Sequence, residues 1–501
     1  MTDTLKALRN KDSSRSLVSD AIPDKIPTGK AMWVMMAMML GSNFLASFSQ
    51  SLMNIALDQV ATDFHVSLSI ANWMVLGFTI VAATVITTAA SLLKRFGIRK
   101  VMMFGYVTCF VGSLLGFLSW DFGSMVAARL IQALTVGLFF PVVTSVILTI
   151  SPKGKGATML AINSGVIGIG LAIAPFAAGM ILTYAGLHAL FLVPLAISIL
   201  LIIFGYFCLH DIYARENRRI DPVSVILSFF GLGVFILGLN EITRNFIPSL
   251  LCMIAGVFLV IIFAWRQTHL EEPLLDLAPL KHPKFVVGEM LMMLGYMGSI
   301  FMSLLVPLYL EGTIGETAFT AGCMLTAPIL CYAFACFAGG RIDDKYGIWP
   351  LISCGFLILL VGFIGMEIAS SAMLVAVMMV CVAISFIGVG LIFPTLKATD
   401  LDTLPREIYA HGSAIHSTLV QIAGSLGSAL FVGIMSADAD RLMAEGLSKA
   451  DAYASGFSHT LSIDLAIVAV AFFVSIIFTR IVVKSKKAAQ PTEAKQPSKI
   501  N

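Results

Sequence analysis

Fourteen apolar stretches follow one another along the chain, and they constrain its fold more than any other feature. Most are as long as the roughly 20 residues with which a helix crosses the hydrocarbon core of a bilayer. Only helices or closed barrels satisfy every backbone N–H and C=O group within lipid, and continuously apolar runs favour helices. The predicted spans are residues 31–56, 68–93, 101–119, 124–149, 157–183, 187–208, 222–241, 247–265, 285–310, 317–339, 349–369, 372–396, 411–436 and 461–479.

Composition agrees with an all-α polytopic membrane protein. Hydrophobic residues make up 58% of the chain and charged residues only 12%, and the mean hydropathy is +0.93, far from the values of soluble domains. The short connections contain no GxxxxGK[ST] loop, which argues against direct ATP-driven transport by this chain alone. The eight cysteines lie within the spans without a CxxC or Cys/His ligand spacing, so we expect neither disulfides nor a metal site.

Basic residues indicate the orientation of the chain in the membrane. We place 28 of the 32 Lys and Arg residues on the side of the N-terminus. An excess of Lys and Arg in short connections marks the cytoplasmic side. Both termini are therefore expected in the cytoplasm, as an even number of spans requires. The polar, basic first 30 residues contain no apolar signal-peptide core, so we expect a multi-pass protein of the cell membrane.

A weak internal repeat predicts the domain organisation. The segments ASLLKRFGIR and GRIDDKYG each follow a span and place basic residues around a glycine, Gly97 or Gly347. Duplicated halves are typical of alternating-access transporters, whose substrate site lies between the halves near the middle of the membrane. The predicted domains are a cytoplasmic N-terminal tail (1–30), a six-helix bundle (31–209), a linker with two inserted transmembrane helices (210–284), a second six-helix bundle (285–484) and a cytoplasmic C-terminal tail (485–501).

Several motifs carry a resemblance to a known family. GRIDDKYG is similar to the signature GxLaDrxG, ARLIQALTVG in the fourth span to RxxQG, and GVIGIGLAIAPFAAG in the fifth span to a glycine/proline antiporter motif. In their order and spacing these segments resemble the fourteen-span drug:proton antiporters of the major facilitator superfamily, of the lincomycin-resistance type. The resemblance covers nearly everything from residue 45 to 436. It implies the major facilitator fold, with two six-helix bundles and two inserted helices.

Glycines and charged turns suggest how such a bundle would open and close. In the fifth span, small residues allow close helix approach and proline allows bending, so this span is predicted to be a gating helix with Gly165, Gly170, Pro175 and Gly179. The two copies of the turn are predicted to latch the cytoplasmic face through charge-assisted hydrogen bonds to helix ends. The first copy departs from the signature, because Ala90 and Lys94 replace its glycine and its acid. The predicted latch residues are Arg95, Gly97, Gly340, Asp344, Lys345 and Gly347.

The first span carries a polar stripe on one helix face, which predicts either a substrate-contacting wall or interhelical hydrogen bonding. Its predicted cavity residues are Asn43, Ser47, Gln50 and Asn54. Similar antiporters carry an acid in the middle of this helix as proton carrier. Here Ser49 and Gln50 occupy that place, and neither titrates, so proton coupling must use another group or be absent.

Four other polar residues within spans are candidates for proton coupling. Burial disfavours a charged carboxyl, so Glu289 in the ninth span is the first alternative carrier, and His416 in the thirteenth is a second. Glu289 could instead reach the interface, and His416 could be a packing residue. Arg129 with Gln132 in the fourth span is implied by the resemblance to act in proton relay, the alternative being a clamp on backbone carbonyls. Four acids near the extracellular ends are expected to be solvated: Asp58, Glu241, Glu367 and Asp464.

These features predict a secondary transporter that exports amphipathic or hydrophobic small molecules by alternating access, coupled to inward proton flow. A substrate-specific metabolite facilitator or symporter is the alternative, favoured by the missing first-span acid. A membrane sensor or scaffold is disfavoured, because no soluble signalling domain is present. We expect no enzymatic activity and no cofactor. The expected partners are a small-molecule substrate, protons and the lipid bilayer, without nucleic acid, and the expected functional unit is a monomer.

Overall fold

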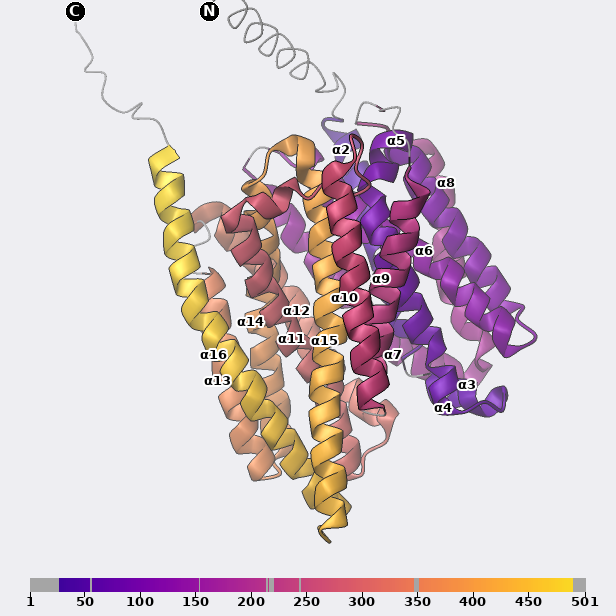
Figure 1. The fold of residues 1–501 in the computed structure, drawn as a ribbon, viewed down its shortest axis with the longest axis vertical. Helices are drawn as coiled ribbons and strands as arrows, with labels where there is room; N and C mark the ends of the chain where they lie inside the picture. The colour runs from indigo at the N-terminus through magenta and orange to yellow at the C-terminus, as the bar shows by residue number, and fades with distance from the viewer. Residues whose placement is uncertain are drawn as a thin grey trace, which may run out of the picture.

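The computed structural model describes residues 27–489 except 55, 153, 213–214, 216–219, 243–244 and 347–350. Thirteen of its helices are long and apolar enough to cross a membrane. They stand side by side in one bundle (Figure 1). Their bounds are α2 Lys30–Leu52, α5 Trp73–Phe117, α6 Phe122–Ile150, α7 Gly156–Ala185, α8 Leu192–Cys208, α9 Pro222–Glu241, α10 Phe246–His269, α11 Pro283–Tyr309, α12 Ala318–Tyr346, α13 Leu351–Ser371, α14 Val375–Asp402, α15 Tyr409–Ala444 and α16 Lys449–Ala489.

Helix α5 covers most of two predicted spans, 68–93 and 101–119, and its backbone is interrupted between them at Gly97. The backbone of Gly97 is not helical there, with φ 81° and ψ 167°, a conformation that favours glycine. A Cβ at this position would lie 2.5 Å from a carboxylate oxygen of Asp211, which accepts a hydrogen bond from the backbone N–H of Arg99 at 2.9 Å. Counting α5 as two spans, the prediction of an all-α polytopic protein with fourteen spans is confirmed.

Several predicted boundaries were wrong on the side opposite the termini. The first span ends at Leu52 rather than 56, and two short helices, α3 (Leu57–Asp63) and α4 (Leu68–Ala71), precede α5. Residues 437–460, between the last two predicted spans, are almost entirely helical, because α15 continues to Ala444 and α16 begins at Lys449. The alanines and leucines of this segment favour helix, although its charged residues make it too polar for lipid.

The early start of α16 also buries Asp464, and this corrects a second prediction. This residue was expected to be solvated near a helix end, but it lies fifteen residues inside α16, or about 22 Å along the axis. Its side chain is fully buried near Gly298 of α11, and neither of its oxygens has a hydrogen-bond partner among the described residues. Glu367 is half-buried and accepts a hydrogen bond from the Ser458 hydroxyl, and Glu241 is half-buried. The side chain of Asp58 lies outside the described residues.

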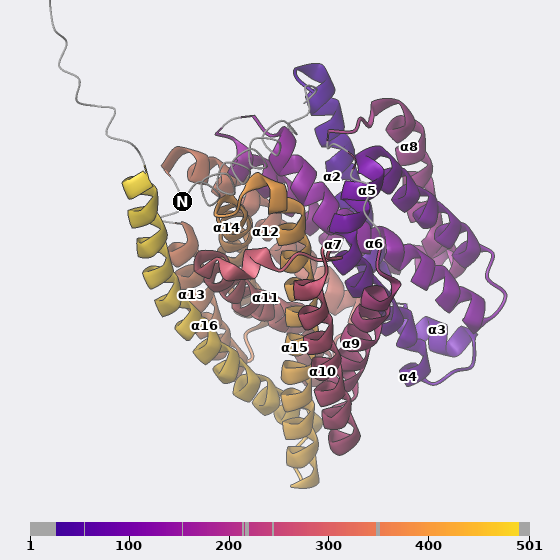
Figure 2. The same cartoon turned by 45° about the horizontal axis from the view of Figure 1, so that its top comes forward.

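Two large hydrophobic clusters organise the bundle. One gathers buried side chains mainly from α2, α5, α6, α7 and α8, and the other gathers those of α11 to α16. We call these two sets of helices the N-group and the C-group. Helix α9 packs against α5 of the N-group and α15 of the C-group, and α10 packs on α9 (Figure 2). This placement fits an inserted helix pair, and the exact domain boundaries remain a prediction.

An ion pair joins α9 and α10 at one end of the bundle. The Arg266 guanidinium donates to both carboxylate oxygens of Asp221, at 2.7 and 3.2 Å, and the Ser224 backbone N–H donates at 3.1 Å. These contacts lower the pKa of Asp221 to about 2, the Arg266 hydrogen bond being the main cause. Asp221 also caps the start of α9, so this ion pair ties the beginning of α9 to the end of α10.

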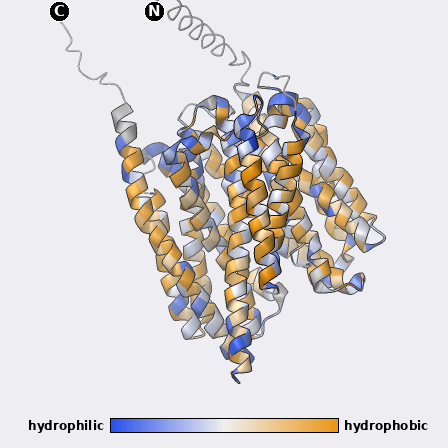
Figure 3. Ribbon diagram, in the orientation of Figure 1, coloured by the Kyte–Doolittle hydropathy of each residue, from blue (hydrophilic) through white to orange (hydrophobic). Residues whose placement is uncertain are grey.

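The hydropathy of the surface is that of a membrane-spanning bundle. Apolar residues cover the length of the helices, and hydrophilic residues gather towards the helix ends (Figure 3). Large side chains such as Phe207 and Trp265 are more than 60% exposed, as expected for side chains that face lipid. Helix α2 begins and α16 ends at the same end of the bundle, which we call the terminal end, and we call the opposite one the far end (Figure 1).

Candidate functional site

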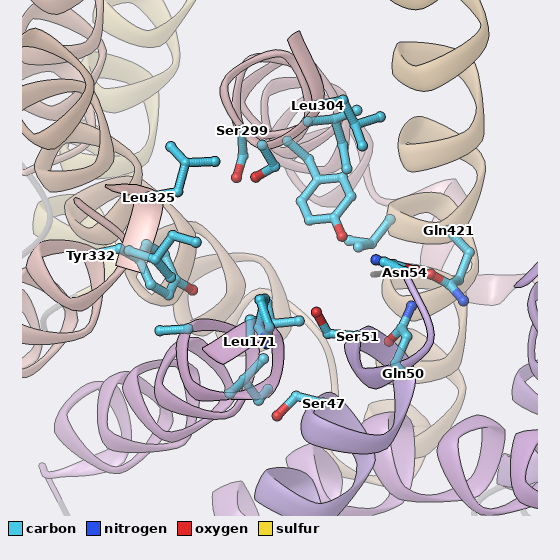
Figure 4. A pocket seen from close by; sticks show the side chains of 18 of the residues that line it. Ser47, Gln50, Ser51, Asn54, Leu171, Ser299, Leu304, Leu325, Tyr332 and Gln421 are labelled. Carbon is cyan, nitrogen blue, oxygen red and sulfur yellow. The ribbon is translucent and has the colours of Figure 1, made fainter. Parts of the chain in front are cut away.

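A cavity of about 900 Å³ lies between the N-group and the C-group. Its wall is formed by α2 and α7 on one side and by α11, α12, α14 and α15 on the other (Figure 4). At the far end it reaches the exposed side chains of Asn54 and Asn240, and towards the terminal end it stops at Lys397 and His416. The cavity is therefore open to one end of the bundle and closed at the other.

The lining combines apolar walls with hydrogen-bonding groups, most of them uncharged, and with the ionisable side chains of Glu241, Glu311, Lys397 and His416. Apolar and aromatic surface comes from residues such as Leu171, Leu304, Leu325 and Tyr332. Hydroxyl and amide groups project between them from α2, α7, α11 and α15. The amide nitrogen of Gln421 is buried and has no hydrogen-bond partner among the described residues. Such a lining suits an amphipathic organic molecule, because apolar walls provide contact area and a few polar groups fix its orientation.

Three of the four predicted cavity residues line this space. Ser47 and Gln50 face it from α2 and Asn54 from the turn just after α2, and Gln50 and Asn54 lie towards Gln421 of α15 (Figure 4). Asn43 does not line it, which corrects that prediction. Its amide donates to the side-chain oxygen of Asn163 in α7 at 2.8 Å, and both residues are fully buried. Asn43 lies where α2 and α7 touch, and it forms the kind of interhelical hydrogen bond that was its alternative interpretation.

Glu289 and His416 were separate candidates in the sequence, and the structure brings them into contact. The Nδ1 atom of His416 lies 3.0 Å from each carboxylate oxygen of Glu289. Both side chains are buried, with 2% and 3% of their surface exposed, so Glu289 does not reach an interface. His416 lines the cavity, whereas Glu289 lies behind it. The pair thus joins the floor of the cavity to the closed end.

Two further charged residues beside this pair were missed. The predicted span 372–396 places Lys397 in a connection, but α14 continues to Asp402. Lys397 and Asp400 are therefore buried, at 8% and 0% exposure, and Lys397 lines the cavity. The carboxylate of Asp400 fills a notch at Gly288, next to Glu289, where an added Cβ would come within 1.8 Å of its Oδ1. The signal available was their spacing of three, which places both on one helix face.

Arg129 and Gln132 form a second buried polar cluster, within the N-group. The Arg129 guanidinium donates to the Ser49 carbonyl of α2 at 3.0 Å and to Gln132 Oε1 at 2.8 Å. It also lies over the ring of Phe78, 4.2 Å from the centroid, and Gln132 donates to the Ser113 hydroxyl at 2.8 Å. The predicted coupling residues therefore fall into two separate sites. The carbonyl contact of Arg129 is the clamp considered as the alternative to a relay role.

The predicted gating helix α7 packs across the boundary between the two groups. A Cβ at Gly165 would meet Phe337 of α12 at 2.5 Å, and one at Gly170 would meet Ser47 of α2 at 2.1 Å. Pro175 lies inside the helix and lines the cavity, and Gly179 is buried. The close approach of α7 to both α2 and α12 is what its small residues permit.

The latch predicted at the terminal end joins the two groups through Asp344. Its carboxylate accepts from the Thr158 backbone N–H at 3.3 Å and from the Thr158 hydroxyl, in the first turn of α7. The same hydroxyl also contacts the Gly340 carbonyl at 3.1 Å. The first copy of the turn is held within the N-group by Asp211 instead. Arg95 is half-buried, Lys345 is exposed, and Gly347 lies outside the described residues.

Gly340 allows the closest backbone approach in this latch, which leads to a prediction. A Cβ at Gly340 would lie 2.3 Å from Ala161 Cβ and 2.9 Å from Thr158 Cα, and neither atom can turn away. Gly340→Ala is therefore expected to separate α7 from α12, at a cost of about 1–3 kcal/mol. Hydrogen–deuterium exchange of peptides that cover residues 156–161 should become about tenfold faster or more.

Gly339→Ala is the matched control for this variant. Its closest contact would be the movable end of Leu391, at 3.1 Å, and its next contacts would lie at an ordinary 3.7 Å, so exchange at residues 156–161 should stay at the wild-type rate. Equal exchange in both variants would show that the Gly340 contact does not hold the terminal end closed.

A helical bundle with a cavity between two helix groups, open at one end and latched at the other, defines a membrane transporter of small molecules. The family model "Major Facilitator Superfamily" matches residues 39–428. The chain belongs to the major facilitator superfamily, and it is a transporter rather than an enzyme.

Relatives and solved structures agree with this assignment. The lincomycin resistance protein LmrB of Bacillus subtilis is 28% identical over 84% of this chain and 89% of its own length. The riboflavin transporter RibZ of Clostridioides difficile is 22% identical over 80% of this chain and 88% of its own length. The human organic anion transporter MFSD10 superimposes with a TM-score of 0.62 at 12% identity over 89% of this chain and 100% of that one. The proton:xylose symporter XylE gives 0.59 at 14% identity over 87% and 94%.

Proposed function

We propose that this transporter exports amphipathic or hydrophobic small molecules by alternating access, in exchange for protons. The cavity supports this proposal, because it lies between the two helix groups and has a mixed apolar and hydrogen-bonding lining. A resistance protein among the relatives supports the export of toxic compounds. The proposed halves are residues 31–209 and 285–484, with 210–284 as an inserted linker and helix pair, in a functional monomer.

We place the terminal end in the cytoplasm of the cell. Most Lys and Arg residues lie in connections at that end, which follows the positive-inside rule. The cavity then faces the outside, and the Asp344 latch closes the inside. This arrangement corresponds to an outward-open state of an exporter. Opening of the latch and closing of the far end would expose the same cavity to the cytoplasm.

The observation that carries the proton-coupling proposal is the buried Glu289–His416 pair. Glu289 lies six residues inside α11, or about 9 Å from the terminal end of that helix. His416 contacts the outward cavity in this state, and opening of the terminal end would bring the pair into contact with the cytoplasm. A protonatable site at a gate that is reached alternately from both sides can carry protons across. Arg129 and Gln132 would transmit the movement of α6 to α2 through the Ser49 carbonyl.

A substrate-specific metabolite facilitator is the second candidate. The observation in its favour is that the residues of α2 that line the cavity, Ser47, Gln50 and Ser51, do not titrate. The riboflavin transporter among the relatives supports it as well. The cavity of such a facilitator would bind one polar aromatic compound specifically rather than many different compounds.

Purified protein in proteoliposomes tests both candidates with labelled lincomycin and labelled riboflavin. Proton antiport predicts accumulation inside vesicles with an acidic lumen and none when the gradient is collapsed or reversed. Accumulation indifferent to the size and direction of the gradient would contradict antiport and favour the facilitator. Movement of riboflavin alone would identify a specific metabolite transporter.

A further inference from the structure

We propose that the segment between α10 and α11 is a strap that holds the terminal end closed, and that it releases α15 when this end opens. The inference rests on the proposed alternating access and gives the inserted helix pair, α9 and α10, a part in it. The strap comprises residues 270–277, which follow the end of α10 and precede the short 3-10 helix η2 (Ala278–Lys281). It lies at the terminal end of the bundle, near α15 (Figure 2).

The first half of the strap is fixed to α5 of the N-group and to α10. The Ser91 hydroxyl of α5 donates to the Leu274 carbonyl at 2.6 Å. The side-chain oxygen of Gln267 in α10 accepts from the backbone N–H groups of Leu274 and Leu275, at 2.7 and 3.3 Å. Ser91 and Gln267 are both buried. The two side chains therefore satisfy backbone groups of a segment that has no regular structure of its own.

Gln267 also connects the strap to α9. Its side-chain nitrogen donates to the hydroxyl of Ser224, in the first turn of α9, at 2.7 Å. A backbone N–H can only donate, so the amide oxygen must face the strap and the amide nitrogen must face α9. The position of the strap thus depends on the position of the inserted helix pair.

The second half of the strap contacts the C-group. The Asp276 backbone N–H donates to Nδ1 of His411, in the first turn of α15, at 3.1 Å. Leu274 and Leu275 are 2% and 4% exposed, and they belong to a buried cluster that contains side chains of α5 as well as Leu401 of α14. The strap therefore joins the two helix groups at the closed end, in addition to the Asp344 latch.

The burial of these contacts indicates which of them breaks when the terminal end opens. The hydrogen bonds that Ser91 and Gln267 form with Leu274 are buried, whereas Asp276, which contacts His411, is partly exposed. A polar group that loses its partner in the interior costs more free energy than one that water can reach. We therefore expect the strap to stay on α5 and α10 and to separate from α15.

Gln267→Met tests whether the strap holds the two groups together. Methionine keeps the length of the side chain but removes the amide, so the strap should leave α10 and the terminal end should loosen. Hydrogen–deuterium exchange should become about tenfold faster or more in peptides that cover the strap, residues 86–93 of α5 and residues 409–416 of α15. Faster exchange confined to the strap would overturn the inference.

Thr268→Ala is the matched control for this variant. Thr268 is the next residue of α10, but it is exposed, and its hydroxyl donates within the same helix to the Trp265 carbonyl. All three regions should keep the wild-type hydrogen exchange rate. If Gln267→Met does not fold, Ser91→Ala removes the donor on the α5 side and should accelerate hydrogen exchange in the same three regions. Wild-type rates in that variant would also overturn the inference.

Two cross-links test which contact breaks. The first joins Asp276→Cys to His411→Cys with a short, reducible thiol reagent and fixes the strap to α15. It should lower uptake of the probe (labelled lincomycin or labelled riboflavin, whichever the wild-type protein moves) about tenfold or more, and reduction should restore uptake. The second joins Ser91→Cys to Leu274→Cys, a contact that should persist, so uptake should change by less than about twofold on cross-linking. Equal inhibition by both cross-links would contradict release of α15.

Single-cysteine variants treated with the same reagent account for the native cysteines. A wild-type protein that moves neither probe would contradict the proposed export of such compounds rather than the strap. The two cross-links are then compared by hydrogen exchange at residues 156–161, which only the link between positions 276 and 411 should slow. Equal slowing by both links, or by neither, would overturn the release of α15.

Discussion

Glu289→Gln is expected to abolish accumulation driven by a proton gradient while substrate exchange without a gradient continues. The substitution keeps the size of the side chain and removes the carboxylate that both 3.0 Å contacts of His416 require. A hydrogen bond to a charged group contributes about 1.5–3 kcal/mol, so we expect gradient-driven transport to fall by about tenfold or more. The measurement is the initial rate of probe uptake with and without an imposed pH gradient.

The exchange reaction is the internal control, because it needs a folded cavity but no net proton movement. Glu407→Gln removes a carboxylate from an exposed position before α15 and should leave both rates at the wild-type level. Loss of exchange as well as accumulation in Glu289→Gln would indicate a structural role for the pair. Undiminished accumulation would remove Glu289 from the proton pathway.

The second large effect is expected from Arg129→Ala, which should abolish transport although the protein still reaches the membrane. The guanidinium is fully buried and connects α6 to α2 through the Ser49 carbonyl, next to Gln132 and the ring of Phe78. Its removal leaves buried acceptors without donors, at about 1–3 kcal/mol each. We expect both accumulation and exchange to fall by about tenfold or more, because movement of the N-group depends on this connection.

Arg129→Lys distinguishes charge from geometry at this site. Lysine keeps the positive charge but lacks the planar fork that reaches two acceptors at once, so only partial recovery is expected. Arg441→Ala, on the exposed end of α15, is the matched surface control. Normal exchange in Arg129→Ala would show that the residue contributes to stability alone.

The location of the spans could be predicted from the sequence because hydropathy is a local property. Each apolar run must become a helix wherever it lies in lipid, so fourteen spans and the all-α class followed without knowledge of any contact. The ends of α14 and α16 were less predictable, because polar helix-forming residues extend a helix beyond its apolar part. That extension is what brought Lys397, Asp400 and Asp464 into the interior.

The contacts within the candidate site could be predicted from the sequence far less well than the spans. The residue types at 289 and 416 indicated protonatable groups, but 127 positions separate them in the chain, and no local pattern predicts their contact. The same holds for Asn43, whose partner Asn163 belongs to another helix. A side chain in a span has several possible helical neighbours, and its chemistry alone does not choose between them.

The sequence by itself therefore determined that the chain is a membrane-spanning helical bundle, which segments cross the bilayer, and the family that its motifs resemble. The tertiary structure alone decided which polar groups share a cavity, which end is closed, and which charges meet beneath the cavity floor. The physical reason is that the cost of unpaired backbone groups in lipid acts on each segment separately. The pairing of buried charges depends instead on the packing of α11, α14 and α15 against one another.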